Sequence, residues 1–565
     1  MSKADDRLEL LLVDADERKP VLDDGLPGDS AERAPKPKKG ARGDDSPDWR
    51  RTDADPNDLP LQRWGVVAPQ GREGDRLLDA IKPLLRLREA EQGAPAIVYR
   101  VPPDMDARQS VAWKDEVYWS EDMPEDDRPL YLMMLGDLHH ISVELQHSLA
   151  NGSLVGRLHC ADSAGDIDLN AYAAYAEKAV RFAREGTSES EADMLFHAAQ
   201  DGTSATQTGE NKLIAPSVAA MVEGKLKGHF PYARLNKLEA ENVDELLAAG
   251  ASERPSVLMS VSHGLGPPRR GFKSEEEQQR RQGAMVLGQG EVLDAECLRS
   301  TPFLPGGLWF YLACFGAGTP AASIYHTWLS QLAQEGAFRD RVDAVLGSLP
   351  KPGQRPFMAA MPQAALANPR GPLAILGHID LAWTYGFSGA KKMSESRKGR
   401  ILSALQVMLR GGRAGVALEA LVRFYRETND ALMASYQLQA DALAAGRPDP
   451  SDHVERGHLW MLRNDLRGYV LLGDPAARLP LQQYSLRASP SVSSAPEIQH
   501  GLRHAGTPAN EGRIASGDAK DIAVQALLQG DQSPRAIAAK AGVSLSILWA
   551  WFDAYRASGG STTVE

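Results

Sequence analysis

The sequence predicts an α/β protein whose central sheet is mostly parallel and covered by helices. Short, unbroken apolar runs such as Val257–Ser262 and Leu308–Ala313 recur along the chain. They suit strands buried on both faces. Helical patterns separate these runs, as repeated βαβ units require. The length of 565 residues, with 43% hydrophobic and 24% charged residues, is typical of a soluble protein of about two to four domains.

The expected elements follow one another from Trp64 onward. The sequence predicts strands at Trp64–Pro69, Ala96–Val101, Tyr131–Asp137, Val257–Ser262, Leu308–Ala313, Leu373–His378 and Gly468–Pro475. Helical patterns cover Asp75–Arg88, 167–186, 211–226, a stretch after Cys314 that runs to about 345, and 393–445.

Composition divides the chain into parts. Residues 1–60 are charged and proline-rich, so they lack the apolar surface that would offset ordering, and we expect a disordered tail. Within this tail, the short segment Leu8–Val13 could dock elsewhere. The remaining expected parts are a smaller α/β subdomain (61–250), a catalytic α/β domain (251–480), a linker rich in Ser, Pro, Ala and Gly (481–515), a helical module (516–557) and a tail (558–565).

Charge and hydropathy restrict the partners. A net charge of -12 argues against an electrostatic nucleic-acid or membrane surface for the chain as a whole. No run of 18 apolar residues occurs, and acidic residues stand where a secretory signal would be basic. We therefore expect a cytoplasmic protein that binds no membrane.

Two residues able to perform acyl chemistry follow two of the apolar runs. His263-Gly264 follows the first run and Cys314 follows the second. Reaction sites in parallel sheets lie at the carboxyl ends of the strands, so the imidazole and the thiol are expected at one edge. Three cysteines are too few and too scattered for a disulfide framework, which leaves Cys314 as a candidate nucleophile.

The expected roles follow from the chemistry of a thiol. Cys314 attacks a peptide carbonyl as thiolate, so it needs a base, and His263 can take its proton and later protonate the leaving amine. The backbone N–H groups of Gly264 and Cys314 can stabilise the oxyanion. In the competing interpretation, Cys314 is a small buried core residue and His263 a satisfied loop histidine.

Other candidates are weaker. His139, His140 and His147 lack a carboxylate at helical spacing on the same face, so we expect ordinary histidines and no metal or other cofactor. Cys160 and Cys297 lack an apolar strand leading into a glycine-rich turn and are interpreted as structural or surface thiols.

At these residues the chain resembles the gingipain-like and caspase-like cysteine peptidases of clan CD, and in particular bacterial gingipain-like peptidases. The segments that carry the resemblance span roughly residues 60 to 480 and include Gln62–Val66, Tyr131–Asp137, Val155–Leu158, Ser262–Gly266, Ala313–Pro320, Gly377–Trp383 and Asn464–Pro475. The resemblance implies a caspase-hemoglobinase-like three-layer α/β/α sandwich, a His263–Cys314 dyad, Gly264 and Cys314 as oxyanion donors, and cleavage after a selected P1 residue.

The resemblance does not transfer the pocket that selects the P1 residue. Selectivity for Arg or Lys would need a buried carboxylate at its base, and Asp380, Asp201 and Asp137 are the candidates. Each is also a common kind of structural capping residue.

The module at 516–557 has the spacing of a helix-turn-helix, with Gly542 at the turn. Its lysines and arginines balance its aspartates, and its second helix is apolar and aromatic, so it suits a protein partner better than DNA. The sequence thus predicts a cytoplasmic bacterial cysteine endopeptidase that is recruited or regulated through this module. An inactive caspase-like scaffold is the alternative, and a DNA-linked regulator is a third interpretation.

Overall fold

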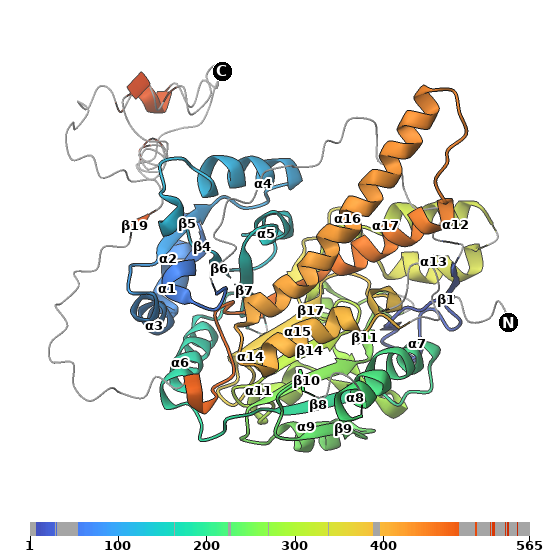
Figure 1. The fold of residues 1–565 in the computed structure, drawn as a ribbon, viewed down its shortest axis with the longest axis horizontal. Helices are drawn as coiled ribbons and strands as arrows, with labels where there is room; N and C mark the ends of the chain where they lie inside the picture. The colour runs from blue at the N-terminus through green and yellow to red at the C-terminus, as the bar shows by residue number, and fades with distance from the viewer. Residues whose placement is uncertain are drawn as a thin grey trace.

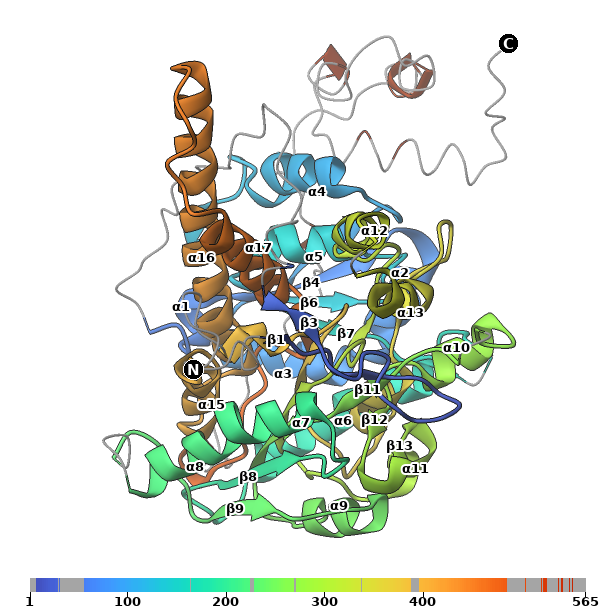
Figure 2. The ribbon, with the colours of Figure 1, turned by 90° about the vertical axis from the view of Figure 1, so that its right-hand side faces the viewer.

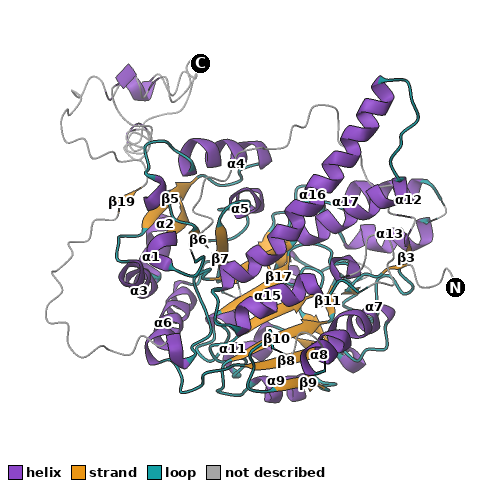
Figure 3. Cartoon of the chain, viewed as in Figure 1, coloured by secondary structure: helices purple, strands orange, loops and turns teal. Residues whose placement is uncertain are grey.

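A computed structural model of the chain describes residues 7–28, 30, 55–162, 164–223, 228–268, 271–336, 338–387, 396–484 and 503–504, with scattered positions between 520 and 551. The predicted α/β class is confirmed, because one large and mostly parallel sheet lies among many helices (Figures 1 and 3). In the part of the chain that the structure describes, no helix is long and apolar enough to span a bilayer.

The large sheet has eleven strands. In spatial order they are β19 (Arg503–His504), β5 (Ile97–Val101), β4 (Trp64–Pro69), β6 (Tyr131–Leu135), β7 (Leu154–Leu158), β18 (Tyr469–Gly473), β17 (Ala374–His378), β14 (Leu308–Leu312), β10 (Ser256–Val261), β8 (Asp193–Ala198) and β9 (Leu235–Leu238). Each strand predicted from an apolar run is present within one or two residues of its predicted bounds.

The sheet has two halves that run in opposite directions. Neighbouring strands pair in parallel within the β19-to-β18 half and within the β17-to-β9 half. Only the join between β17 and β18 is antiparallel among the described pairs of this sheet. The carboxyl ends of the two halves therefore lie at opposite edges. The predicted domain boundary at 250 is crossed by this sheet, because β8 and β9 precede it in sequence yet belong to the second half.

Helices flank the sheet at sites that the local sequence explains. The helical pattern at 75–88 becomes two helices, α2 (Gly71–Ala80) and α3 (Lys82–Gln92), because Ile81 leaves helical geometry and Pro83 stands in the first turn of the next helix. The other main helices are α4 (Ala107–Trp113), α5 (Val143–Ala150), α6 (Leu169–Glu185), α7 (Ser204–Gly209), α8 (Ala215–Val222), α9 (Val243–Gly250), α10 (Glu275–Arg281), α11 (Ala295–Ser300), α12 (His326–Gln334), α13 (Arg339–Ser348), α14 (Ala360–Ala367), α15 (Gly399–Leu409), α16 (Ala414–Ala444) and α17 (His453–Arg467). Helix α16 is long and projects from the body (Figure 1).

Residues 7–28 differ from the expectation of a disordered tail. They form β1 (Arg7–Leu8), β2 (Leu12–Val13) and β3 (Leu26–Pro27), and β1 pairs with β3. The leucines of this stretch are buried in the main core, so they supply the apolar surface that the charged remainder lacks. Strand β2 joins a small sheet with β11 (His263–Leu265), β12 (Met285–Val286) and β13 (Val292–Leu293), and Figure 2 shows this part of the chain crossing beside β11.

The predicted linker and helical module fall mostly outside the described residues, as does the tail at 558–565. Within the module, the described positions Ala523, Ile537 and Leu548 are buried together, with Ala541 and Trp551 packed against them.

Candidate active site

The structure brings His263 and Cys314 to the same sheet edge. Strands β10 and β14 are parallel neighbours in which Val261 pairs with Leu312, so each candidate residue stands two positions beyond a paired residue. A Cβ built on Gly264 would lie 1.9 Å from the carbonyl oxygen of Cys314, so the two backbones are in contact. Only glycine fits this approach.

The imidazole of His263 is fully buried and held on one side. Its Nε2 lies 2.9 Å from Oγ1 of Thr203 and 3.7 Å from Oδ2 of Asp201. Asp201 in turn accepts hydrogen bonds from the Thr203 N–H and from the Thr206 hydroxyl. The Nδ1 atom is buried and has no hydrogen-bond partner among the described residues. The ring is thus oriented through Nε2, and Nδ1 is left to exchange a proton.

The sulfur of Cys314 is also fully buried. It accepts the Ala382 N–H at 3.2 Å and lies 3.5 Å from the Ala382 carbonyl oxygen. Among the hydrogen bonds of the described residues, none joins it to His263. The two residues therefore share an edge without a direct thiol–imidazole bond in this state.

Burial controls the protonation of both groups. It lowers the pKa of His263 to about 4, although the charge of Asp201 acts to raise it. Burial raises the pKa of the Cys314 thiol well above its usual range; the Ala382 N–H opposes this shift, while the charges of Asp380 and Asp465 add to it. At neutral pH the pair is a neutral thiol and a neutral imidazole.

Two backbone donors converge on one carbonyl oxygen. The Gly264 N–H donates to the oxygen of Leu11 at 2.8 Å, and the Cys314 N–H donates to the same oxygen at 3.2 Å. These are the two N–H groups that the sequence analysis names as oxyanion donors, and the structure shows them both bonded to one carbonyl oxygen. The carbonyl that they hold belongs to this chain's own segment Leu8–Val13.

Asp201 and Asp380, two of the three pocket candidates, have hydrogen-bond partners near His263 and Cys314. Asp201 lies beside the imidazole, as described above. The carboxylate of Asp380 accepts the N–H groups of Leu381 at 2.7 Å and Ile324 at 3.0 Å, while burial raises its pKa to about 6. Its backbone oxygen accepts the Phe315 N–H, so Asp380 fixes the loop that follows Cys314.

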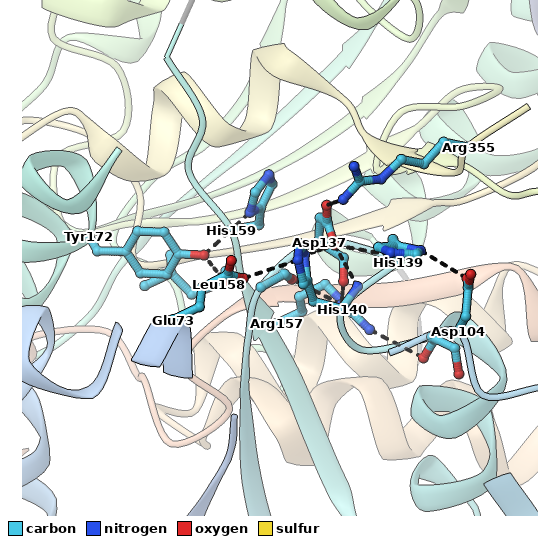
Figure 4. A network of polar contacts seen from close by, with 12 residues as sticks. Glu73, Asp104, Asp137, His139, His140, Arg157, Leu158, His159, Tyr172 and Arg355 are labelled. Atoms are coloured by element: carbon cyan, nitrogen blue, oxygen red, sulfur yellow. Dashed lines mark hydrogen bonds and ion pairs between the residues drawn. The ribbon is translucent and has the colours of Figure 1, made fainter. Parts of the chain in front are cut away.

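Asp137 belongs to the other half of the sheet, where it follows β6. Figure 4 shows it amid a polar network in which it accepts from His140 Nδ1 at 2.8 Å and pairs with Arg355 at 3.0 Å. Burial alone would raise its pKa, but the His140 hydrogen bond and the nearby His159 hold it well below its usual range. Asp137 lines a cavity of about 450 Å³ together with His159 and Cys160. The structure does not bring it together with His263 and Cys314.

The histidines considered as metal ligands have other surroundings. His139 pairs with Asp104, His140 pairs with Asp137 and Glu73, and burial lowers the pKa of His147 well below its usual value. Across the described ranges, no group of three or more His, Cys, Asp or Glu side chains is arranged to hold a metal ion.

The sequence did not predict the residues that hold His263 and the backbone next to Cys314 in place. Thr203 carries no motif, and it reaches His263 from 60 positions away. Asp465, in α17, accepts the Trp383 N–H at 2.8 Å and so fixes the strand-like residues after Asp380; burial raises its pKa to about 7. The resemblance covered the neighbourhood of Asp465, but nothing in the local pattern distinguishes its role.

The chain matches no family model, and no curated protein resembles it in sequence. The solved structures that share part of its backbone arrangement include the following two. The complex of the pro- and mature domains of RgpB from Porphyromonas gingivalis has 10% identity and a TM-score of 0.42, covering 74% of this chain and 79% of that one. A structure of a protease has 12% identity and a TM-score of 0.38, covering 74% and 78%. At these scores the chemistry has to be argued from the site itself.

Proposed function

We propose that this protein is a cysteine endopeptidase in which Cys314 is the nucleophile and His263 the general acid and base. The observation that carries the proposal is the convergence of the Gly264 and Cys314 N–H groups on one peptide carbonyl oxygen. A carbonyl held by the nucleophile's own N–H and by a second donor is polarised toward addition.

The reaction follows from the groups present. Nδ1 of His263 takes the proton of the Cys314 thiol, and Sγ adds to the carbonyl carbon while the two N–H groups hold the oxyanion. Collapse breaks the C–N bond, and the imidazolium gives its proton to the departing amine. Water, deprotonated by the same nitrogen, then hydrolyses the thioester, which restores the thiol.

Hydrolysis of a proteome-derived peptide library by the full chain tests the proposal. Prolonged incubation is needed because the thiol is covered. We expect Cys314→Ala and His263→Ala each to lose at least about 10³-fold of the activity, because a nucleophile and its base act as a unit. Cys297→Ala, at a partly exposed cysteine in α11, is the matched control and should retain it.

The second candidate is a non-enzymatic scaffold that keeps the fold and binds peptides in the same cleft. The sealed sulfur and the absence of a bond to His263 in the described state favour it. Peptide binding without hydrolysis, or labelling of Cys160 or Cys297 in preference to Cys314 by a peptidyl probe, would support it.

We further propose that the protein is cytoplasmic and that residues 516–557 recruit a protein partner. Affinity capture with the full chain, compared with a variant carrying Trp551→Ala, tests recruitment; Trp551 packs beside the buried residues of this module. Salt-sensitive DNA affinity that the same substitution reduces would instead support a DNA-linked regulator.

A further inference from the structure

The segment Leu8–Val13, called here the inserted segment, lies over the dyad. Leu8, Leu10, Leu11 and Leu12 have no exposed surface, although they come from a stretch rich in charge. Leu11 supplies the carbonyl oxygen held by the Gly264 and Cys314 N–H groups. The peptide bond that follows this carbonyl joins Leu11 to Leu12.

On the amino side of this bond, the inserted segment runs antiparallel to the residues after Asp380. The Leu11 N–H donates to the Ala382 oxygen at 3.4 Å, Leu10 forms an antiparallel bridge with Trp383, and the Thr384 N–H donates to the Glu9 oxygen at 3.3 Å. Alternate backbone bonds of this kind are how an extended peptide is held at a sheet edge.

On the carboxyl side, the inserted segment becomes β2 and pairs in parallel with β11. Leu12 stands opposite Gly264, Val13 stands opposite Leu265, and the Gly266 N–H donates to the Val13 oxygen at 2.5 Å. Backbone contacts therefore continue on both sides of the Leu11–Leu12 bond, which lies at the donors.

We propose that the inserted segment occupies the catalytic cleft in the direction and register of a substrate, with Leu11 as its P1 residue, so that the cleft selects leucine-like P1 residues and the full chain stays latent while the segment is docked. This inference rests on the proposed function, because it names the substrate class of that site.

The chemistry around Leu11 favours an apolar P1 residue. Leu11 is fully buried, whereas selection of Arg or Lys would need an available carboxylate beside it. Of the acids considered for that task, Asp380 is bonded to two backbone N–H groups and Asp201 serves the His263 site. Two residues before Leu11, Glu9 is the one charged residue of the inserted segment. The Glu9 carboxylate accepts the Ser204 hydroxyl at 2.8 Å.

The inserted segment is held at both ends, which explains why the thiol is sealed. At its amino-terminal end, Arg7–Leu8 pairs with Leu26–Pro27. At its carboxyl-terminal end, the Leu12 oxygen accepts a hydrogen bond from the Val21 N–H. The turn Asp14–Lys19, whose residues 16–19 are exposed, closes this loop, with the Arg18 N–H bonded to Asp14. A peptide in solution reaches Cys314 only after the segment has moved.

The first experiment measures exposure of the thiol and does not depend on catalysis. Leu11→Asp in the full chain places a carboxylate where Leu11 is buried, which disfavours docking of the segment. We expect iodoacetamide to alkylate Cys314 at least about tenfold faster in this variant. Peptide mass spectrometry measures the rate. Asp16→Ala, in the exposed turn, is the control and should leave the rate unchanged. If thermal melting shows that Leu11→Asp fails to fold, Leu11→Ala replaces it with a smaller acceleration. Equal rates in the wild type and the folded variant would overturn latency.

The second experiment uses the same variant to read the P1 preference. Fluorogenic peptides with the sequence Leu-Glu-Leu-X carry Leu, Arg or Asp at X, and we expect cleavage after Leu to exceed the others by at least about tenfold in kcat/KM. Cleavage after Arg or Asp in preference to Leu would overturn the P1 assignment while leaving the peptidase proposal intact. An exposed thiol with no cleavage of any peptide would contradict the peptidase proposal while leaving the covering role of the segment intact.

Discussion

Cys314 and Cys160 occupy matching places in the two halves of the sheet. Cys314 stands two residues past the end of β14, and Cys160 stands two residues past the end of β7. Both thiols are buried; burial raises the pKa of Cys160 to about 12 and that of Cys314 well above its usual value. Each half also has a buried histidine whose pKa burial lowers to about 4, His263 near the first thiol and His159 beside the second.

The two places differ in what surrounds the thiol. At Cys314, two backbone N–H groups converge on a carbonyl from a distant segment, and the side chains of Cys314 and His263 are fully buried. Near Cys160, His159 faces the Tyr172 hydroxyl at 3.3 Å (Figure 4). His159 and Cys160 themselves line a cavity of about 450 Å³. Position and pKa are therefore alike for the two cysteines, whereas convergent backbone donors are found at Cys314, the cysteine proposed as the nucleophile.

Of the changes considered beyond those at His263 and Cys314, Gly264→Ala, which adds one methyl group, is expected to reduce hydrolysis the most. The new Cβ of Gly264→Ala would meet the Cys314 carbonyl, so the two backbones must separate and the oxyanion donors diverge. We expect about a 10²-fold loss of peptide hydrolysis and a loss of about 1–3 kcal/mol in the free energy of unfolding.

Gly399→Ala is the matched control, because a Cβ there meets no atom within 4 Å. Full activity in a folded Gly264→Ala variant would mean that the converging N–H groups do not act in catalysis.

Asp201→Asn tests whether the carboxylate beside His263 sets the pKa of that histidine. Without this carboxylate the protonated imidazole of His263 loses a favourable charge, so its pKa falls and the acid limb of the pH–rate profile moves to lower pH. We expect kcat to fall roughly tenfold to a hundredfold, with KM little changed.

The matched change in the other half is Tyr172→Phe, which removes the hydroxyl that faces His159. It should leave the pH profile of hydrolysis in place. A profile that Asp201→Asn does not move would assign Asp201 a purely structural role.

The inserted segment carries one titratable group whose charge opposes docking. Burial raises the pKa of Glu9, partly offset by Ser204, Arg7 and Lys212, while Asp24 adds to the rise. A docked segment therefore favours protonated Glu9: this stabilisation is complete below the ordinary value of 4.5 and is lost as pH rises through the raised pKa.

Raising the pH above the raised pKa of Glu9 should loosen the inserted segment. The reaction rate of Cys314 with a thiol reagent should then increase severalfold more than that of Cys160. Disulfide exchange with dithiodipyridine, followed at both cysteines in the same sample, measures the ratio. In Glu9→Gln the ratio should be flat with pH, because the amide stays neutral and can still accept from Ser204. A ratio that rises equally in both proteins would exclude Glu9 as its cause.

Cys160→Ala is expected to have the smallest effect. Its thiol has no part in the proposed reaction, so hydrolysis should stay within about twofold of the wild type, while the lost packing costs about 1 kcal/mol in a denaturant titration. A large loss of activity would mean that the cavity in the other half contributes to the site.

The strands that end at the dyad could be predicted because fully buried parallel strands consist of continuous apolar residues, as in β10 and β14. Gly264 could be predicted as a donor because a residue without Cβ next to a histidine permits close approach. Thr203, Asp201 and Asp465 could not be assigned their roles, since each acts through a hydrogen bond or ion pair to a residue remote in sequence. The position of Leu8–Val13 beside Gly264 and Cys314 could not be predicted either, because a short apolar stretch among charged residues does not specify which surface it covers.

The inserted segment belongs to the same chain as the proposed site that it covers, and the pairing of Arg7–Leu8 with Leu26–Pro27 anchors its amino-terminal end. A tethered strand competes with any peptide at an effective concentration on the order of millimolar, whatever the protein concentration. Dilution therefore does not release it, and a free peptide at a lower concentration displaces it in only a small fraction of the molecules. Apart from the titration of Glu9, the segment would then be released by a partner or protease that acts on the exposed residues Asp16–Lys19 of its turn.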